Sequence, residues 1–356
     1  MKTTELVPVE RFLPDAVREK FQDLHESAVE FENASTSKNT QVAYQRAWTR
    51  FENWCAAHSV PSLPTTAQVL RLYITDAAKK GIPHLDGTPG RPMGRRSIDV
   101  HLSAIIFVHD YKFKDQDGFV NPARALSEVF IKGVRRGLRK PAKKKMHITL
   151  KQLYAAVASI PNTFRGKRDR AVLLCAFAAG GRRRSEVVAM RREDIVKTAE
   201  GDWLWTVAES KTDQEGAGFV VAIPKLKKAG GCPATALDAW LAASRISTGP
   251  VFPGLNKYDQ VVYREGPGNT LLGAQPRLVA TLMKQMAEKL KLDPSVFAGH
   301  SIRSGFATDM ATKGMRLEDI MARTGHKSVA VVQGYIRAGR MLSQEDVVRK
   351  ALDTED

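Results

Sequence analysis

The sequence predicts a mainly α-helical protein with one small antiparallel sheet, divided into two domains. Its 356 residues are enough for two separate cores. Apolar residues recur at helical spacing through the first half, and two short strand-like segments interrupt the helices of the second half. A proline-containing basic stretch separates the halves. We therefore expect an N-terminal helical domain over residues 1–139, a linker over 140–147 and a mixed α+β domain over 148–356.

Charge is the most informative property of the composition. Lysine and arginine outnumber acidic residues by 55 to 38, which gives a formal net charge of +17 and a pI near 9.8. Such a chain is expected to bind a polyanion, and nucleic acid is the most common one. Ribosomal proteins and histones are equally basic, so charge alone does not separate an enzyme from a binding protein.

Neither a membrane span nor a disulfide framework is expected. No apolar run approaches the roughly 18 residues that a span requires, and the N-terminus lacks the apolar core of a signal peptide. The three cysteines are far apart and form no CxxC pair: Cys55, Cys175 and Cys232. They are typical of reduced core residues in a cytoplasmic protein.

Four amphipathic helices are expected in the first domain. In the first of them, apolar side chains recur at i, i+4, i+7 and i+11 from Tyr44 to Cys55. Thr66 is a candidate cap for the second, and the third carries an apolar stripe from Ile98 to His109. The four segments cover 39–58, 65–81, 95–113 and 123–138.

Basic residues concentrate at the expected domain boundary. From Val129 to Arg168, lysines and arginines are frequent and there is no acidic residue. Pro141 and the lysines that follow it oppose a helix, so residues 140–147 are expected to be extended. The stretch could be a solvated linker or could lie along phosphates, and the two interpretations are compatible.

The second domain mixes helices and strands. Two short strands are expected over 202–210 and 218–224, on either side of a polar turn that contains Lys211. No GxxxxGK[ST] or GxGxxG motif occurs, so the sequence gives no support for a nucleotide cofactor. Helices are expected over 149–160, 168–180, 233–245, 275–291, 301–313, 317–324 and 328–337.

Several short segments of this domain carry side chains suited to binding phosphate. Three arginines precede an apolar helix face over 179–190, and Lys211 lies in the expected hairpin turn. His300 and Arg303 are three positions apart, so on a helix they share a face and could hold one anion. Each feature alone also has an ordinary explanation, such as a solvated corner, a solubilising lysine or a chance pair.

The last such segment contains a tyrosine. Tyr335 is i+3 from Val332 and i+4 from Val331, which by itself favours a core tyrosine. Taken in order, however, R-x-x-E, a hairpin lysine, H-x-x-R and H-x8-Y resemble the tyrosine recombinases (the phage integrase family), and Cre-like phage recombinases most closely. The resemblance covers residues 170–340 and extends more weakly to the helical half.

This resemblance implies how the site would act on DNA. Tyr335 corresponds to the nucleophile, which attacks a phosphodiester and forms a 3′-phosphotyrosyl intermediate. Arg183 and Arg303 correspond to the arginines that hold the phosphate oxygens, and Glu186 would orient the site. Residue 182 is an arginine where the family usually has an apolar residue, so it stays open which arginine of the run points inward.

Three further residues match positions that handle protons and phosphate oxygens. A tyrosine with a pKa of about 10 costs roughly 4 kcal/mol to ionise at pH 7, and His300 is the candidate base. Lys211 is the candidate acid for the leaving 5′-oxygen. His326 would hydrogen-bond the phosphate. The mechanism implied needs no metal ion, ATP or other cofactor.

DNA binding is expected to involve both domains, as a clamp around a duplex positioned mainly through phosphates. Arg95 and Arg96 begin a helix that could enter a major groove, and Arg277 is a second candidate base reader. The full set of candidate DNA-binding residues is Arg95, Arg96, Arg135, Arg136, Arg139, Lys143, Lys144, Lys145, Arg182 and Arg277.

The end of the chain predicts a short amphipathic helix over 343–353. Such a helix is marginal alone and needs a surface to pack against. It could fold back on its own domain, whereas the resemblance implies docking into a neighbouring protomer and a homotetramer on two DNA sites. A cytoplasmic, prokaryotic or phage-encoded protein associated with the nucleoid is implied as well. The apolar positions are Val347, Val348, Ala351 and Leu352.

Two other functions fit part of the pattern. A type IB topoisomerase-like enzyme would share the tyrosine chemistry and relax supercoils with little site preference. A non-catalytic DNA-binding protein would need only the charge. Each expected catalytic position holds a competent residue type, which favours the recombinase interpretation. The target DNA sequence, and whether cleavage occurs in cis or in trans, stay open.

Overall fold

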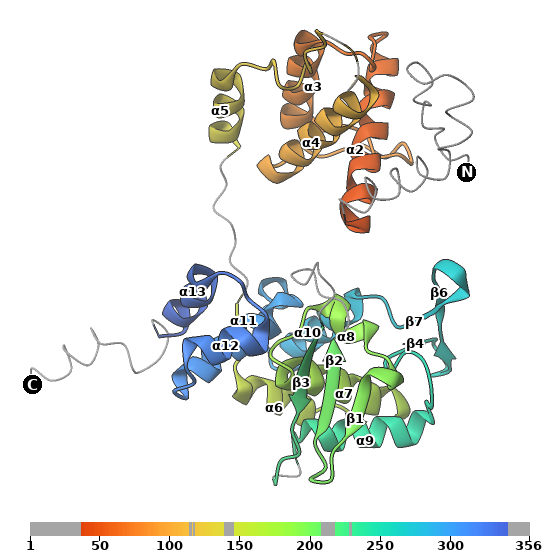
Figure 1. The fold of residues 1–356 in the computed structure, drawn as a ribbon, viewed down its shortest axis with the longest axis vertical. Coiled ribbons are helices and arrows are strands. Elements are labelled where there is room, and N and C mark those ends of the chain that lie inside the picture. Colours follow the sequence, from red (N-terminus) through yellow and green to blue (C-terminus); the bar gives the residue numbers. More distant parts are fainter. Residues whose placement is uncertain are drawn as a thin grey trace, which may run out of the picture. The chain divides into compact units, whose positions relative to one another are not determined.

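The computed structural model describes residues 37–113, 116, 118–138, 146–207, 218–227 and 230–340. The chain divides into two units, Met1–Ala142 and Lys143–Asp356 (Figure 1). Each unit has a hydrophobic core of its own.

Helices make up the regular structure described in the first unit. Ser37, Thr66 and Ser127 are N-caps whose side chains accept hydrogen bonds from backbone amides of the first turn. Because Ser127 caps the last helix, this helix begins later than the sequence predicts. The helices are α2 (Lys38–Ala57), α3 (Ala67–Lys79), α4 (Arg95–Phe113) and α5 (Glu128–Gly137).

The core of the first unit lies among α2, α3 and α4. Phe51, Tyr73 and Ile105 are fully buried. The ring centroids of Phe51 and Tyr73 are 4.9 Å apart, in an edge-to-face arrangement. The apolar stripe predicted from Ile98 to His109 on α4 is buried, as expected.

The second unit combines helices with three small sheets (Figure 1). Its helices are α6 (Leu150–Ala158), α7 (Phe164–Ala178), α8 (Arg184–Ala189), α9 (Pro233–Ser244), α10 (Arg277–Lys289), α11 (His300–Thr312), α12 (Leu317–Thr324) and α13 (Val329–Arg340). Its strands are β1 (Ile195–Lys197), β2 (Trp203–Val207), β3 (Phe219–Ile223), β4 (Gly254–Leu255), β5 (Val261–Val262), β6 (Arg264–Glu265) and β7 (Leu271–Leu272).

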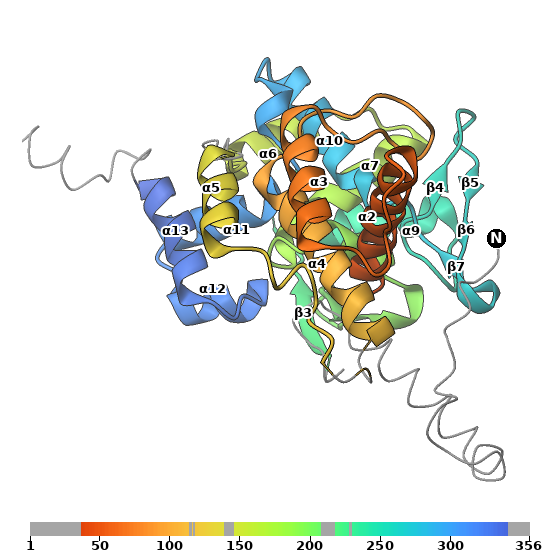
Figure 2. The ribbon, with the colours of Figure 1, turned by 90° about the horizontal axis from the view of Figure 1, so that it is seen from above.

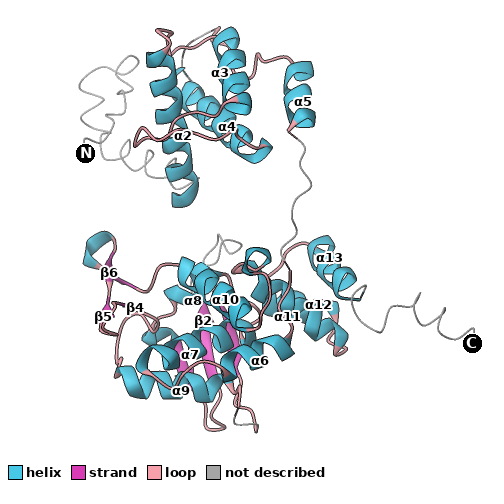
Figure 3. Cartoon of the chain, turned by 180° about the vertical axis from the view of Figure 1, so that it is seen from behind, coloured by secondary structure: helices cyan, strands magenta, loops and turns pink. Residues whose placement is uncertain are grey.

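The largest sheet has the order β1-β2-β3, and its neighbours are antiparallel. Trp205 pairs with Ile195 on one side and with Val221 on the other. Along β2, buried and exposed residues alternate, as expected for a strand with one face toward a core. Helices α7 and α9 cover that face (Figures 1 and 3).

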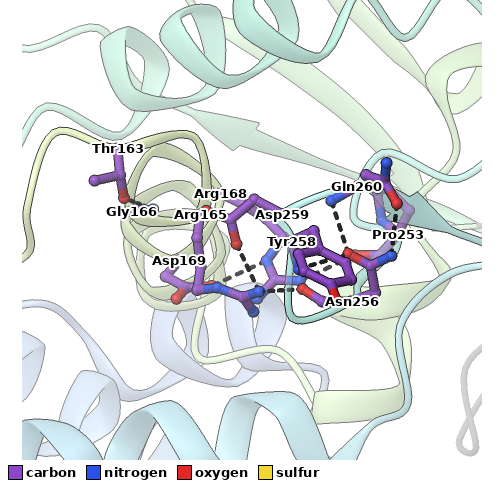
Figure 4. A network of polar contacts seen from close by, with 10 residues as sticks. All are labelled: Thr163, Arg165, Gly166, Arg168, Asp169, Pro253, Asn256, Tyr258, Asp259 and Gln260. Carbon is purple, nitrogen blue, oxygen red and sulfur yellow. Dashed lines mark hydrogen bonds and ion pairs between the residues drawn. The ribbon is translucent and has the colours of Figure 1, made fainter.

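Two arginines near the start of α7 anchor the segment that contains β4 and the turn after it (Figure 4). Arg165 donates to the Asn256 carbonyl at 2.5 Å and forms an ion pair with Asp259 at 2.6 Å. The buried Arg168 donates to the Pro253 carbonyl at 3.3 Å and pairs with Asp169. Part of the basic run predicted around the linker therefore serves the internal structure of this unit.

The chain enters the second unit alongside α11. Met146 N donates to the Val296 carbonyl at 2.9 Å, and Ile148 N donates to the Ser301 carbonyl at 3.1 Å. Gly305 permits this approach, because a Cβ there would lie 2.0 Å from the Ile148 carbonyl oxygen. The start of α11 is thereby fixed. Helices α11–α13 lie at one end of the unit and β4–β7 at the other (Figures 1 and 2).

The predicted fold class, mainly helical with a small antiparallel sheet, is confirmed. The prediction missed β1 and β4–β7, because strands of two or three residues have no periodicity to detect. No helix among the described residues is long and apolar enough to cross a membrane. Several predicted features lie outside the described residues: Arg139, Lys143, Lys144, Lys145, Lys211 and the helix over 343–353.

His101 makes the stability of the first unit depend on pH. Its Nδ1 lies 2.6 Å from the Tyr73 hydroxyl in the core. Burial, with a smaller contribution from the charge of Arg50, lowers the pKa of His101 to about 4. As pH falls below about 6.5, the unfolded chain binds a proton that the folded chain does not. We expect this group to remove about 2 kcal/mol of unfolding free energy between pH 7 and pH 4.5.

Urea titrations of the full chain and of His101→Asn measure this effect. Asparagine offers a hydrogen-bonding group near the position of Nδ1 but does not titrate, while the other titrating groups are common to both proteins. The difference in unfolding free energy between the two proteins is expected to change by about 2 kcal/mol across that range. An identical pH dependence would contradict the assignment.

Candidate active site

A glycine turn after α7 brings the arginine run to the start of α8. Gly180 and Gly181 have φ angles of 93° and 64°, in the left-handed region that favours glycine. A Cβ on Gly181 would lie 2.4 Å from the Cα of Arg303, and one on Gly180 would lie 2.2 Å from the Arg323 carbonyl oxygen. The turn therefore packs directly against α11 and the end of α12.

Glu186 orients the arginine run. Arg183 donates to the two carboxylate oxygens of Glu186, from its backbone N at 3.1 Å and from Nη1 at 2.7 Å. Arg182 Nη1 lies 3.8 Å from Glu186 Oε2. The side chain of Arg182 is 1% exposed and that of Arg183 is 26% exposed. Arg183 is thus held by the carboxylate and open to a ligand.

Arg182, which the sequence predicts to bind DNA, is buried in the structure. Its guanidinium lies over the ring of Phe219 at 4.6 Å and donates to the Arg323 carbonyl oxygen. Burial is the main reason that the pKa of Arg182 is lowered to about 10, so the group is still charged at neutral pH. A side chain this buried cannot reach a duplex while its surroundings stay folded. It braces the end of α12 against the first residue of β3.

Helix α11 presents Arg303 from its first turn. The residue is 2% exposed. Its Nε donates to His326 Nε2 at 3.0 Å, and its Nη1 donates to the Gly181 carbonyl at 3.4 Å. Its Nη2 is buried and has no hydrogen-bond partner in the part of the chain that the structure describes. A buried charged donor without a partner is costly, which makes this edge a candidate site for an anion.

His326 lies in the turn between α12 and α13, after the left-handed cap Gly325. Its Nε2 accepts from Arg303, and its Nδ1 lies 2.7 Å from the Thr324 hydroxyl. The hydroxyl of Thr324, which is fully buried, donates to the Met321 carbonyl at 3.3 Å. Both ring nitrogens of His326 are therefore engaged by the protein.

Arg323 ties this turn to the rest of the unit. Its Nη2 donates to the Ala178 carbonyl at 3.0 Å, at the end of α7, and to the Ala222 carbonyl at 2.6 Å, in β3. Spacing and periodicity did not identify Arg323 or Thr324. The local signal was a polar pair that a single glycine separates from the H-x8-Y motif.

Helix α13 brings Tyr335 to His300, the first residue of α11. The Tyr335 hydroxyl and His300 Nε2 are 2.6 Å apart, and the ring centroids are 5.9 Å apart. The ring of His326 is 5.8 Å from that of Tyr335. Of the two valines that share the predicted apolar stripe with Tyr335, only one is buried. Val332 is fully buried, whereas Val331 is 44% exposed.

The environment keeps the tyrosine and both histidines neutral at neutral pH. Burial raises the pKa of Tyr335, and the charge of Arg303 only partly offsets this. Loss of hydration, followed by the charges of Arg303 and Arg183, lowers the pKa of His300. Burial and then Arg303 lower the pKa of His326 to about 3. The tyrosine hydroxyl can therefore donate, and His300 can accept its proton.

The structure thus brings together the predicted catalytic residues that it describes: Arg183, Glu186, His300, Arg303, His326 and Tyr335. Lys211, the other predicted member, lies outside the described residues. In the described ranges, no group of three or more His, Cys, Asp or Glu side chains could hold a metal ion.

The remaining predicted DNA-binding residues that the structure describes lie at the surface. Arg95, the first residue of α4, and Arg135, on α5, share Asp99 as an ion-pair partner, at 3.7 Å and 2.9 Å. Arg277 is the first residue of α10. Three are exposed and have no described ion pair: Arg96, Arg136 and Arg277.

Sequence comparisons identify related proteins over most of the chain. The sequence model of the phage integrase family matches residues 256–340. An integrase/recombinase xerD homolog from Selenomonas ruminantium is 31% identical over 320 residues, which are 88% of this chain and 86% of that protein.

Solved structures of similar fold include three complexes with DNA. An XerH site-specific recombinase bound to a palindromic difH substrate has a TM-score of 0.53 at 13% identity, covering 84% of this chain and 76% of that one. A lambda integrase dimer bound to a COC′ core site has a TM-score of 0.53 at 15% identity, covering 89% and 94%. The Tn1549 transposon integrase with transposon right-end DNA has a TM-score of 0.55 at 14% identity, covering 92% and 96%.

Gly181→Ala is expected to lower the unfolding free energy of the second unit by at least about 2 kcal/mol, because a Cβ would meet α11 and the φ angle is strained for alanine. Gly334→Ala is the matched control, since nothing lies within 4 Å of a Cβ there and the residue is inside α13. Chemical denaturation of the full chain measures both. Equal stability of the two variants would contradict the close approach of the turn to Arg303.

Proposed function

The chain belongs to the phage integrase family of tyrosine recombinases, and from this membership we propose that it is a site-specific DNA recombinase. It would cut and rejoin DNA through a 3′-phosphotyrosyl intermediate on Tyr335, without a metal ion or ATP. The tyrosine would act in the site of its own chain, because its hydroxyl already lies 2.6 Å from His300 Nε2 of the same chain.

One observation carries this proposal. The hydrogen bond between Tyr335 and His300 stands beside Arg303, whose buried Nη2 has no partner among the described residues. A nucleophile, a neutral base and an uncompensated cation are what attack on an anionic phosphodiester requires. A core tyrosine satisfied by a histidine would not explain the unpartnered guanidinium edge.

The first chemical step transfers the phosphoryl group to the protein. A bond forms between the Tyr335 oxygen and phosphorus, and the bond from phosphorus to the 5′-oxygen breaks. The phenolic proton passes to His300. Arg183 and Arg303 stabilise the negative charge that grows on the non-bridging oxygens, because both can donate from planar, permanently charged groups.

Protonation of the leaving group completes that step. We assign this role to Lys211, which belongs to the chain segment that joins β2 to β3. Phe219, the end of this segment, packs on Arg182. In the rejoining step, the 5′-hydroxyl of another strand attacks the phosphotyrosine and releases Tyr335. The phosphodiester energy is conserved in the covalent link, so no external energy source is needed.

DNA binding would use the exposed cations of both units, as a clamp on one duplex. The start of α4, with Arg95 and Arg96, is suited to a major groove, and Arg277 at the start of α10 is a second candidate contact. The basic residues of the linker over 140–147 would contact phosphates. Both the XerH complex and the lambda integrase complex contain DNA.

Assembly into a homotetramer on two sites would use the C-terminal segment 343–353. The second unit has an apolar groove of about 270 Å³, lined in part by Leu153, Tyr154, Phe306 and Met315. Val347, Val348, Ala351 and Leu352 give the segment the apolar face that such a groove accepts. We propose that the segment of one protomer occupies the groove of its neighbour.

Tyr335→Phe is expected to abolish covalent attachment of the protein to DNA while leaving DNA affinity unchanged. Random-sequence duplexes are incubated with each protein, resolved on a denaturing gel, and the attached DNA is sequenced. Wild-type protein is expected to yield an adduct enriched in one sequence, in excess EDTA as well. The variant is expected to yield none, because phenylalanine has no oxygen to attack phosphorus.

An adduct that persists in Tyr335→Phe would contradict the nucleophile assignment. Loss of the wild-type adduct in EDTA would indicate metal-dependent chemistry instead. An adduct without sequence enrichment, together with relaxation of supercoiled DNA, would favour the topoisomerase-like alternative. Wild-type binding without any adduct would favour the non-catalytic one.

Deletion of residues 343–356 is expected to spare binding of one protomer to a half-site and to impair pairing of two sites by at least about tenfold. Met315→Lys, which places a charge in the groove, is expected to have the same effect because it blocks the acceptor. Gel-shift titrations and light scattering of the DNA complexes measure both. Normal pairing by the deletion variant would reject docking of the segment in a neighbour.

A further inference from the structure

A chain of hydrogen bonds runs from a backbone carbonyl to Arg303. The Thr324 hydroxyl lies 3.3 Å from the Met321 carbonyl oxygen and 2.7 Å from His326 Nδ1. His326 Nε2 lies 3.0 Å from Arg303 Nε. Thr324 is fully buried and Arg303 is 2% exposed, so the protein shields this chain from water.

The two groups at the ends of this series of hydrogen bonds, the Arg303 guanidinium and the Met321 carbonyl, fix the direction of every hydrogen bond in it. A guanidinium can only donate, so His326 Nε2 must be the acceptor and carry no proton. A carbonyl can only accept, so the Thr324 hydroxyl donates its proton to Met321. The hydroxyl oxygen is then left to accept from His326, which must carry its proton on Nδ1.

The charges around His326 favour this neutral form. Arg303 contacts the ring directly, and Arg183 and Arg182 add positive charge nearby. His300 would add a further positive charge if it were protonated. Tyr335, the other titratable group against the ring, is neutral. Burial and these charges lower the pKa of His326 to about 3, so protonation does not compete at neutral pH.

The Nδ1–H tautomer of His326 fixes the orientation of the Arg303 guanidinium, because it leaves Nε2 free to accept from Arg303 Nε. With Nε held by His326 and Nη1 by the Gly181 carbonyl, the Nη2 edge is the part of the guanidinium left without a partner among the described residues. Transfer of the imidazole proton to Nε2 would place a donor against a donor, and rotation of the ring would put a carbon in place of the acceptor nitrogen. Arg303 would then have to leave the position in which Nη2 is presented.

We propose that Thr324 is a positioning residue for the recombination reaction: its hydroxyl holds His326 in the Nδ1–H tautomer, and His326 in turn holds Arg303 with Nη2 toward the scissile phosphate. This inference rests on the proposed function and deepens it. His326 then acts through Arg303, and not as a direct donor to the phosphate.

The surroundings keep Thr324 in place independently of DNA. Arg182 donates to the carbonyl of Arg323, the preceding residue, and Arg323 itself donates to carbonyls of α7 and β3. Gly325 follows in the left-handed conformation with φ of 69° and ends the helix. The hydroxyl of Thr324 is therefore presented to His326 from a fixed backbone.

The tautomer can be measured on the full-length protein without DNA. Long-range proton–nitrogen spectra of protein labelled with nitrogen-15 in histidine distinguish protonated from unprotonated ring nitrogens, and the His326 signals are assigned from their loss in His326→Gln. Wild-type protein and Thr324→Ser are expected to show Nδ1 protonated. Thr324→Val is expected to show a mixture, because Nδ1–H loses its acceptor.

The effect on the reaction is measured with the duplex recovered from the wild-type adduct. Thr324→Val is expected to slow single-turnover adduct formation about 10-fold with unchanged DNA affinity, while Thr324→Ser stays within about threefold of wild type. Thr198→Val is the matched control and is expected to have no effect. It also removes a buried threonine hydroxyl, but that hydroxyl has no hydrogen-bond partner among the described residues.

Specific outcomes overturn the role of Thr324. These are protonation at Nε2 in wild-type protein, an unchanged Nδ1–H tautomer in Thr324→Val, an unchanged rate in Thr324→Val, or equal slowing by valine and serine. A wild-type protein that forms no adduct would instead contradict the proposed function. The spectra would still test the hydrogen-bond chain in that case.

Discussion

The constraint on which the rest of the site depends is the burial of two guanidinium groups, those of Arg182 and Arg303, near a single carboxylate. The carboxylate is that of Glu186, which forms ion pairs with Arg182 and with the partly exposed Arg183. The other partners of the two buried guanidinium groups, those of Arg182 and Arg303, are backbone carbonyls, an aromatic face and a neutral imidazole. Arg182 Nε and Arg303 Nη2 have no hydrogen-bond partner among the described residues. None of these partners carries a negative charge, so the site keeps a positive surplus. A phosphodiester approaching its transition state supplies the missing negative charge.

The local fold follows from the need to bring these groups together from distant parts of the sequence. Consecutive glycines let the turn after α7 touch the backbone of Arg303. Residues 146–148 fasten the start of α11, and Arg323 fastens the end of α12 to α7 and β3. The segments that carry the charged groups are thus tied to one another by backbone contacts and hydrogen bonds. Burial, and then the same positive surplus, lower the pKa of His300 and of His326. Both rings are therefore neutral at neutral pH, and His300 has a free lone pair for the proton of Tyr335.

Much of the helical framework could be predicted from the sequence, because caps such as Thr66 and apolar stripes such as that of α4 are local features. The order of the motifs also predicted that His300, Arg303, His326 and Tyr335 would lie together. What could not be predicted depends on contacts between segments far apart in the chain. The burial of Arg182 requires Phe219 and the carbonyl of Arg323, and no periodicity marks either. The outward orientation of Val331 likewise depends on which side of α13 meets α11.

The central claim is that Tyr335 itself becomes bonded to DNA. Digestion of the denatured wild-type adduct with trypsin and nuclease, followed by mass spectrometry, identifies the modified residue directly. The account predicts a nucleotide attached through its 3′-phosphate to Tyr335 in the peptide that begins after Lys327. Attachment to another side chain, or a 5′-phosphate linkage at Tyr335, would contradict it.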